Sequence, residues 1–276
     1  MRVTLAGALF AMALAMPASS AQDLDVPTPY LPSTPLNVDE MLRLASVTPG
    51  DMVYDLGSGD GRVVIAAARD YGARGVGIEL DGKLVAESAE NARRAGVSDR
   101  VSFRQADVLT VPLADASIVT LYLLPSLVRK LQDRLYGELK PGARIVAHDY
   151  PFPDWQADRR VAVSKTFYLY TVPARVAGAW KLGVDAAGAA RTYDLALEQR
   201  YQQVKGAARV QGGILPAFEA RVSGERISFI LVDGDYSYRY DGAVRGDRME
   251  GAVRWGYGPR QNEARWQAMR IAGAGG

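Results

Sequence analysis

Short apolar runs and helix-length amphipathic segments alternate along residues 37–173. Five apolar runs predict β-strands, at 52–56, 75–79, 101–104, 118–123 and 145–148. Three segments with apolar residues at helical spacing predict helices between them, at 61–71, 84–95 and 126–139. Asn37 is a plausible N-cap for a shorter helix that carries Met41, Leu42 and Leu44 on one face. This alternation predicts an α/β domain with a mostly parallel sheet and helices on both faces, and residues 165–172 predict an antiparallel edge strand.

The pattern changes after Pro173, where helical spacing gives way to short alternating segments separated by glycine or Asp-Gly. Eight such segments predict strands, at 178–184, 191–198, 202–210, 218–222, 226–232, 236–240, 248–255 and 265–271. Asp233-Gly234 is a strong hairpin signal. We therefore predict two domains, an α/β domain over 37–173 and a small antiparallel barrel or sandwich over 174–272.

The first residues read as a targeting segment rather than as part of a fold. Arg2 is followed by apolar and small residues over 3–16, and Ser19-Ser20-Ala21 suits cleavage by a signal peptidase. The apolar run is shorter than the ~20 residues that a membrane-spanning helix needs, and no later stretch is long and apolar enough. We expect a signal peptide over 1–21 and an exported protein in the periplasm or cell envelope, with a retained N-terminal anchor as the alternative. A proline-rich segment over 22–36 follows.

The composition of the chain limits which partners and which kinds of site it can have. The chain holds 33 Lys and Arg against 31 Asp and Glu, so its charge does not favour nucleic acid as a partner. It has no cysteine and one histidine, which excludes disulfides and a Cys nucleophile and leaves little for a metal site; we predict no metal.

A glycine-rich turn joins the first predicted strand to the first predicted helix. The candidate binding residues in it are Asp55, Gly57, Ser58, Gly59, Asp60 and Gly61. A dinucleotide site would need G-x-G-x-x-G, whereas Arg62 stands where the third glycine would fall. The carboxylates of Asp55 and Asp60 would repel a pyrophosphate and attract the ammonium and sulfonium of S-adenosylmethionine. A tight turn without a ligand is the alternative.

Two further acids end the next strands. Glu79 lies 24 residues after Asp55, where a carboxylate can accept hydrogen bonds from ribose hydroxyls. Asp107 could accept from an adenine amino group while the backbone at Val108 reads the ring edge. Glu79 could instead be a solvated strand end, and Asp107 a turn or N-cap residue. Acids at the ends of three successive strands nevertheless favour S-adenosylmethionine as the cofactor.

These residues resemble a known family. The matching segments are 32–35, 38–42, 49–51, 54–62, 75–80, 121–125 and 139–142. They are similar to class I protein-lysine methyltransferases with a Rossmann-like fold, nearest the mitochondrial enzymes that methylate the ATP synthase c subunit and the adenine nucleotide translocase, and their bacterial relatives. The resemblance covers roughly 27–172. It implies that Asp55, Gly57, Gly59 and Glu79 contact the donor, with Asp107 at the adenine.

The same resemblance places Tyr122 at the acceptor end of the fourth strand. A lysine acceptor must lose its proton, and burial in an aromatic channel lowers its pKa. Tyr122 and Tyr30 are candidates to line that channel, with Thr34 beside Tyr30 in the proline-rich lid. His148 is a candidate base, although a structural role for His148 and plain core packing for Tyr122 stay open. Residues 121–125 lack the Asp/Asn-Pro-Pro-aromatic run of enzymes that methylate nucleic acid bases.

The leading functional hypothesis is methyl transfer to a protein lysine. The alternatives are methylation of a small molecule or lipid, and an inactive methyltransferase-like binding protein in the cell envelope. The predicted β domain carries no catalytic constellation. Its Trp180, Trp255 and Trp266 are spaced as core or barrel-end aromatics, and the alternative is a ligand-holding barrel or a docking surface.

Overall fold

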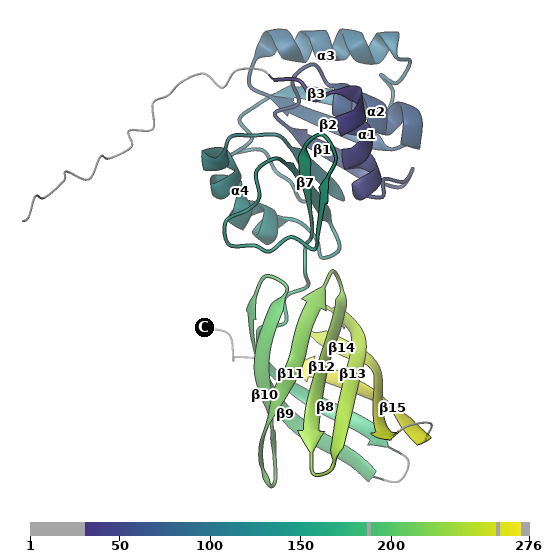
Figure 1. Cartoon of the computed structure of the whole chain (residues 1–276), viewed down its shortest axis with the longest axis vertical. Helices are drawn as coiled ribbons and strands as arrows, with labels where there is room; N and C mark the ends of the chain where they lie inside the picture. The colour runs from purple at the N-terminus through teal and green to yellow at the C-terminus, as the bar shows by residue number, and fades with distance from the viewer. Residues whose placement is uncertain (1–30, 187–188, 258–259, 272–276) are drawn as a thin grey trace, which may run out of the picture. The chain divides into compact units, whose positions relative to one another are not determined.

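The computed structural model describes residues 31–186, 189–257 and 260–271, which fold into an α/β domain and a β-barrel (Figure 1). The predicted signal peptide, Tyr30 and the last five residues lie outside this description. The helices are α1 (Pro35–Leu44), α2 (Arg62–Tyr71), α3 (Gly82–Arg94) and α4 (Pro125–Glu138). The strands of the first sheet are β1 (Met52–Leu56), β2 (Arg74–Glu79), β3 (Val101–Gln105), β4 (Ile118–Leu121), β5 (Arg144–His148), β6 (Arg159–Ala162) and β7 (Thr166–Thr171).

The first sheet has seven strands in the order β3-β2-β1-β4-β5-β7-β6. Strands β1 to β5 pair in parallel, and β7 pairs antiparallel with both β5 and β6. The chain steps from β1 outward to β2 and β3, then returns to β4 on the other side of β1. Ligands of open α/β sheets bind at the carboxyl ends of the strands where the order reverses, so β1 and β4 mark the place to look.

Alternating residues of the strands build two cores, one on each face of this sheet. Val53, Ile118 and Val146 pack with helices α1 and α2, whereas Tyr54 and Val119 pack with α4. The neighbouring strand residues Val53 and Tyr54 therefore serve opposite layers, as the period of a strand requires. The predicted α/β fold with helices on both faces is confirmed.

Two sequence predictions in this domain are wrong in detail. Helix α1 begins at Pro35, not after Asn37, because the Thr34 hydroxyl caps it by accepting from the Asn37 N–H at 3.3 Å. Proline suits the first helical position, where its missing N–H has no partner to lose. Strand β7 is antiparallel as expected, but it is not the edge: β6, which the sequence did not predict, pairs along its outer side.

All eight strands predicted after Pro173 are present, and they close into an antiparallel barrel rather than a sandwich. They are β8 (Gly178–Ala186), β9 (Ala189–Arg200), β10 (Gln203–Val210), β11 (Gly213–Ser223), β12 (Arg226–Asp233), β13 (Tyr236–Arg245), β14 (Arg248–Tyr257) and β15 (Arg260–Arg270). Pairing of β15 with β8 closes the ring. The interior is filled with apolar side chains, including Trp180 and Trp266, and Trp255 packs against them, as predicted.

None of the helices in the described part of the chain is long and apolar enough to cross a membrane.

Candidate active site

The glycine-rich turn follows β1 at the carboxyl edge of the sheet. Gly57, Gly59 and Gly61 have φ values of 79°, 53° and 82°, a region that side chains disfavour. A Cβ at Gly57 would lie 2.8 Å from Leu123 Cδ2, so a side chain there would require Leu123 to move and would strain the backbone at this φ. The N–H groups of Gly57 and Ser58 both donate to the Ile78 carbonyl at 2.9 Å, which fixes the turn against β2. The turn thus exposes backbone at a fixed position beside β1.

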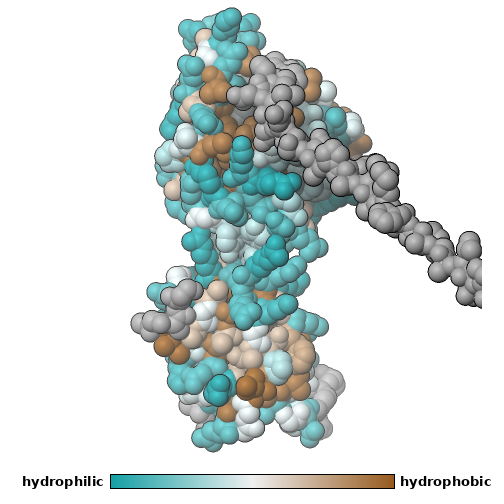
Figure 2. Space-filling model, turned by 90° about the vertical axis from the view of Figure 1, so that its left-hand side faces the viewer, coloured by the Kyte–Doolittle hydropathy of each residue, from teal (hydrophilic) through white to brown (hydrophobic). Residues whose placement is uncertain are grey.

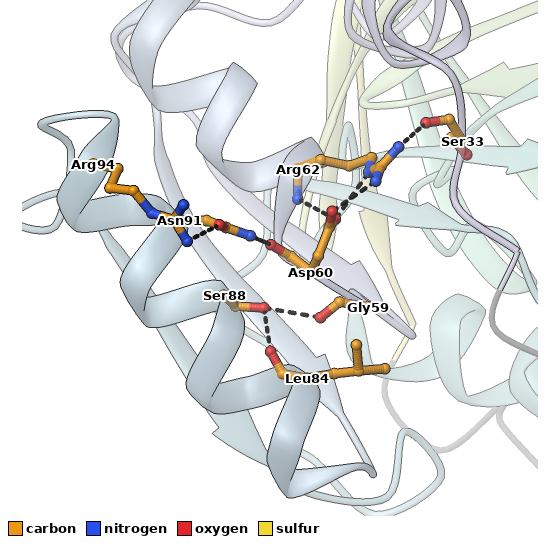
Figure 3. Close-up of polar contacts among 8 residues, drawn as sticks. All are labelled: Ser33, Gly59, Asp60, Arg62, Leu84, Ser88, Asn91 and Arg94. Carbon is orange, nitrogen blue, oxygen red and sulfur yellow. Dashed lines mark hydrogen bonds and ion pairs between the residues drawn. The ribbon is translucent and has the colours of Figure 1, made fainter.

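Helix α3 and Arg62, the residue that follows the glycine-rich turn, hold the turn in place (Figure 3). The Ser88 hydroxyl donates to the Gly59 carbonyl at 2.8 Å, and the Asn91 side-chain amide donates to the Asp60 carbonyl at 3.0 Å. Arg62 binds the Asp60 carboxylate through Nε at 2.8 Å and Nη2 at 2.6 Å. The carboxylate of Asp60 is therefore partly neutralised and held by the first residue of α2.

Glu79 ends β2 and its carboxylate is oriented by backbone N–H groups. Oε2 accepts from the Gly59 N–H at 2.9 Å, while Oε1 accepts from the Leu80 and Asp81 N–H groups at 2.8 and 3.1 Å. Oε1 already accepts two hydrogen bonds, whereas Oε2 accepts one and retains acceptor capacity. Glu79 thus both closes the glycine turn and presents a fixed acceptor, as required of a residue that binds a ribose hydroxyl.

Asp55 lies at the base of the turn and is buried, with 5% of its surface exposed. Its Oδ1 accepts from the Thr120 hydroxyl on β4 at 2.7 Å. Burial raises the pKa of Asp55 to about 7, and the negative charges of Glu79 and Asp60 add to the rise. A cation that binds beside this carboxyl would favour its ionised form.

Asp107, the acid that follows β3, is more exposed than Asp55. Its Oδ1 accepts from the Leu109 N–H at 2.8 Å in a local turn. Val108 is buried in the core beneath it. The turn role that the sequence left open for Asp107 is therefore present, and Oδ2 stays available to a ligand group.

These residues fit S-adenosylmethionine better than a dinucleotide. Three carboxylates, from Asp55, Asp60 and Glu79, lie around a turn in which a Cβ would clash. This donor set attracts a cation and repels a pyrophosphate. Asp55, Gly57 and Glu79 would hold the donor, whose sulfonium supplies an activated methyl group when bound.

A second cluster lies at the ends of β4 and β5. The Tyr122 ring stacks on the His148 ring with centroids 3.9 Å apart, and Phe167 on β7 packs against the imidazole at 4.8 Å. His148 is 1% exposed, and its Nδ1 lies 3.2 Å from the Ser33 hydroxyl. Burial lowers the pKa of His148 to about 4 against the opposing charge of Asp149, so the ring is neutral near pH 7.

Ser33 joins the two clusters, and sequence reasoning missed it. Its carbonyl accepts from Arg62 Nη1 at 2.6 Å, as Figure 3 shows. Its hydroxyl lies 3.2 Å from His148 Nδ1, so the segment before α1 contacts both the residue that follows the glycine turn and β5. Thr34, predicted as a lid residue, caps α1. The signal was available, because Ser33 lies between two prolines in a segment used for the family resemblance.

Comparison with known proteins agrees with this geometry. The family model of the ANTKMT methyltransferase domain matches residues 55–159. A protein-lysine N-methyltransferase of Saccharolobus islandicus is 35% identical over 150 residues, which cover 52% of this chain and 93% of that enzyme. The mouse adenine nucleotide translocase lysine N-methyltransferase is 40% identical over 133 residues, 48% of this chain and 58% of that enzyme.

A crystal structure described as an RNA methyltransferase from Salinibacter ruber in complex with S-adenosyl-L-homocysteine is 48% identical. The match covers 53% of this chain and 96% of that one, with a TM-score of 0.52. The bound molecule is the product that S-adenosylmethionine leaves after methyl transfer, so the relative supports the cofactor assigned from the carboxylates. The chain belongs to the ANTKMT-type family of methyltransferases, and it is an enzyme that uses S-adenosylmethionine as its methyl donor.

Proposed function

We propose that the enzyme methylates the side-chain amine of a lysine in a protein. The observation that carries the proposal is the 35% identity to a protein-lysine N-methyltransferase across 93% of that enzyme's length. The mouse relatives, at 40% identity, are also named lysine N-methyltransferases, although the matched segments span only 58% and 52% of their lengths.

The cluster of Tyr122 and His148 supplies a site with the chemistry that a lysine needs. In the transfer, a bond forms between the amine nitrogen and the methyl carbon as the carbon–sulfur bond breaks, the thioether leaves, and the amine gives up a proton. A lysine ammonium has an ordinary pKa near ~10.4, so the site must favour the neutral amine. Aromatic surroundings do so by withdrawing water from the charge. The charges next to this cluster are those of Asp149, 3.9 Å from His148 Nε2, and of Lys165, which pairs with Asp149 at 2.8 Å.

His148 fits this task as a neutral ring. Its low pKa means that it does not place a positive charge beside the incoming amine near pH 7. Its Nε2 is buried and has no hydrogen-bond partner within the described residues. An unpaired buried ring nitrogen is costly unless a ligand completes it. We infer that Tyr122 lines the acceptor channel and that Nε2 of His148 is the group that meets the amine or its proton.

Export is part of the proposal. The basic start and apolar run over 3–16, followed by Ser19-Ser20-Ala21, support a signal peptide over 1–21 and a place in the periplasm or cell envelope of a bacterium. Amino-terminal sequencing of the protein recovered from fractionated cells tests this. A mature chain starting near Gln22 in the envelope fraction is expected, and an intact Met1 in the cytoplasmic fraction contradicts it.

The acceptor is tested with donor labelled in its methyl group. The purified enzyme is incubated with protein, RNA, lipid and small-molecule fractions of a bacterial lysate, beside the variant Glu79→Ala, which removes the oriented acceptor of the donor site. Label in protein that is recovered as methylated lysine after hydrolysis, and that the variant does not produce, is expected.

Each other outcome identifies an alternative. Label in RNA would favour the acceptor class named for the 48% identical structure, and label in lipid or metabolites would favour a small-molecule enzyme. Donor binding without label in any fraction would mean a binding protein. Any of these results overturns the lysine proposal.

A further inference from the structure

The outer surface of the barrel carries an apolar patch on two adjacent strands. Along β12 the side chains of Ile227, Phe229 and Leu231 are buried in the barrel, so Ile230 and Val232 face outward. The apolar patch consists of Ile214, Pro216 and Phe218 on β11 together with Ile230 and Val232 on β12.

The strand register makes this patch continuous. Phe218 pairs with Ile230 across the two strands, and Ile214 and Pro216 continue the same outward row of β11. Ile214 is 62% exposed, Phe218 49% and Val232 43%. Figure 2 shows apolar residues gathered on the barrel surface among hydrophilic ones. A contiguous exposed group of this kind marks an interaction site more often than scattered apolar residues do.

The charges around the patch are predominantly positive. Among the outward positions of β10 to β13, six are cations and two are acids. The cations are Lys205, Arg209, Arg221, Arg226, Arg239 and Arg245, and the acids are Glu219 and Asp241. Both acids already face arginines, Glu219 at 3.6 Å from Arg239 and Asp241 at 2.9 Å from Arg254. We call this half of the barrel the basic face.

The other half of the barrel provides an internal comparison. The described outward positions of β14, β15, β8 and β9 hold five cations and five acids. They are Lys181, Arg200, Arg248, Arg254 and Arg265 against Asp185, Asp194, Glu198, Glu250 and Glu263. This half carries one large exposed apolar side chain, Met269, among its described outward positions. Positive charge and apolar surface are therefore combined on one side of the ring.

We propose that the basic face docks on the surface of an anionic lipid bilayer. The apolar patch would enter the boundary between headgroups and acyl chains, while Lys205, Arg209 and Arg221 would contact lipid phosphates. A nucleic acid would satisfy the cations but would leave the apolar patch in water. An anionic bilayer satisfies both, and the methyltransferase domain would thereby be held near membrane-associated acceptors.

The test is co-sedimentation of the full chain with lipid vesicles. Vesicles of phosphatidylcholine that contain phosphatidylglycerol are compared with vesicles of phosphatidylcholine alone, at low and high salt. Binding to the anionic vesicles that weakens with salt is expected. Each cation lost from the basic face is expected to reduce the partition coefficient about fivefold, which corresponds to about 1 kcal/mol per basic residue at the surface.

Matched variants on the two halves of the barrel distinguish binding through the basic face from nonspecific binding to vesicles. Phe218→Ser with Ile230→Ser is expected to reduce binding about tenfold or more, given the size of the apolar side chains removed. Arg209→Glu with Arg221→Glu is expected to abolish the preference for anionic vesicles. Met269→Ser and Arg265→Glu, on the other half, are expected to leave binding unchanged.

Donor binding and the thermal unfolding midpoint report folding in every variant, and neither needs an acceptor. The proposal is overturned if the folded protein does not bind anionic vesicles. It is also overturned if the control variants weaken binding as much as the basic-face variants do. Because no methyl transfer is measured, the result is independent of whether lysine is the acceptor.

Discussion

The buried carboxyl of Asp55 makes donor affinity depend on pH. Its pKa of about 7 arises from burial and from the nearby charges of Glu79 and Asp60. A cationic donor binds the ionised carboxylate and not the neutral acid, so below about pH 7 binding must first remove a proton. We therefore expect S-adenosylmethionine affinity to fall as the pH falls, and Asp55→Asn to remove most of that dependence.

The magnitude follows from the pKa. If only the ionised form binds, the apparent dissociation constant rises by a factor of one plus ten to the power of pKa minus pH. That factor is about 1.1 at pH 8, about 2 at pH 7, about 11 at pH 6 and about 100 at pH 5. At pH 6 about 0.9 protons leave Asp55 on binding, since about nine in ten molecules start protonated.

Isothermal titration calorimetry measures both quantities. The affinity is followed from pH 5 to pH 7, below the ~7.7–8.0 at which an α-amino group titrates, so that the donor's own ammonium keeps its charge. Repeating the titration at pH 6 in buffers of different ionisation enthalpy gives the number of protons released. Glu79→Gln is the control: it weakens binding and keeps Asp55 buried, so the pH dependence persists, but its midpoint moves to lower pH because the charge of Glu79 no longer helps to raise the Asp55 pKa.

The raised pKa of Asp55 also predicts that the free energy of unfolding of the donor-free protein falls as the pH rises, whereas donor affinity increases. The folded-state pKa lies above the unfolded value of 3.8, so the stabilising effect of the protonated form is complete below about pH 4. It is lost as the pH rises through about 7, at a cost on the order of 4 kcal/mol for the donor-free protein. Denaturant unfolding of the wild type and Asp55→Asn isolates this difference.

For donor binding, an affinity that is constant between pH 5 and pH 7, with no proton released, would refute the assignment of the pH dependence to Asp55.

Three further substitutions test the remaining contacts. Glu79→Ala is expected to weaken S-adenosylmethionine binding by ~1.5–3 kcal/mol in calorimetry, the contribution of a charged hydrogen bond; unchanged affinity would remove Glu79 from the site. Gly61→Ala is expected to lower the unfolding free energy by about 1–3 kcal/mol, because φ is 82° and the Cβ would lie 2.6 Å from Phe103 Cε1; a denaturant midpoint equal to wild type would contradict this. His148 is the chain's one histidine, so nitrogen-15 NMR of an untagged protein reads it alone: it should titrate near 4, and Ser33→Ala should change its tautomer ratio but leave its pKa low, whereas a pKa near 6.5 would mean that the ring is not buried.

The donor site could be predicted from the sequence because its chemistry is local. Asp55, the glycine turn and Glu79 lie at the ends of strands that are neighbours in both sequence and sheet. In parallel βαβ units such ends always meet at one edge, so finding the strands suffices to bring the acids together. The hydrogen bond from the Gly59 N–H to Glu79 is the direct result of that convergence.

Details that depend on distant segments could not be predicted in this way. Strand β6 has mostly exposed residues and no alternating apolar pattern, so only its pairing with β7 defines it. The barrel was left as a barrel or a sandwich because closure depends on β8 pairing with β15, which are far apart in sequence. Periodicity reports which face of a strand is buried, but not which strand lies next to it.

The acceptor cluster is the clearest case, since it needs three segments that the sequence keeps far apart. Tyr122 follows β4, His148 ends β5, and Ser33 precedes α1, 115 positions before the histidine that it contacts. From the sequence alone, a lone histidine is more simply a core residue, and its burial agrees with that interpretation. The structure adds that one ring nitrogen is held by Ser33, a residue tied through Arg62 to the donor turn. A buried structural histidine would also need a hydrogen bond of this kind. The acceptor proposal therefore rests on the other ring nitrogen, Nε2, which is buried and has no hydrogen-bond partner among the described residues.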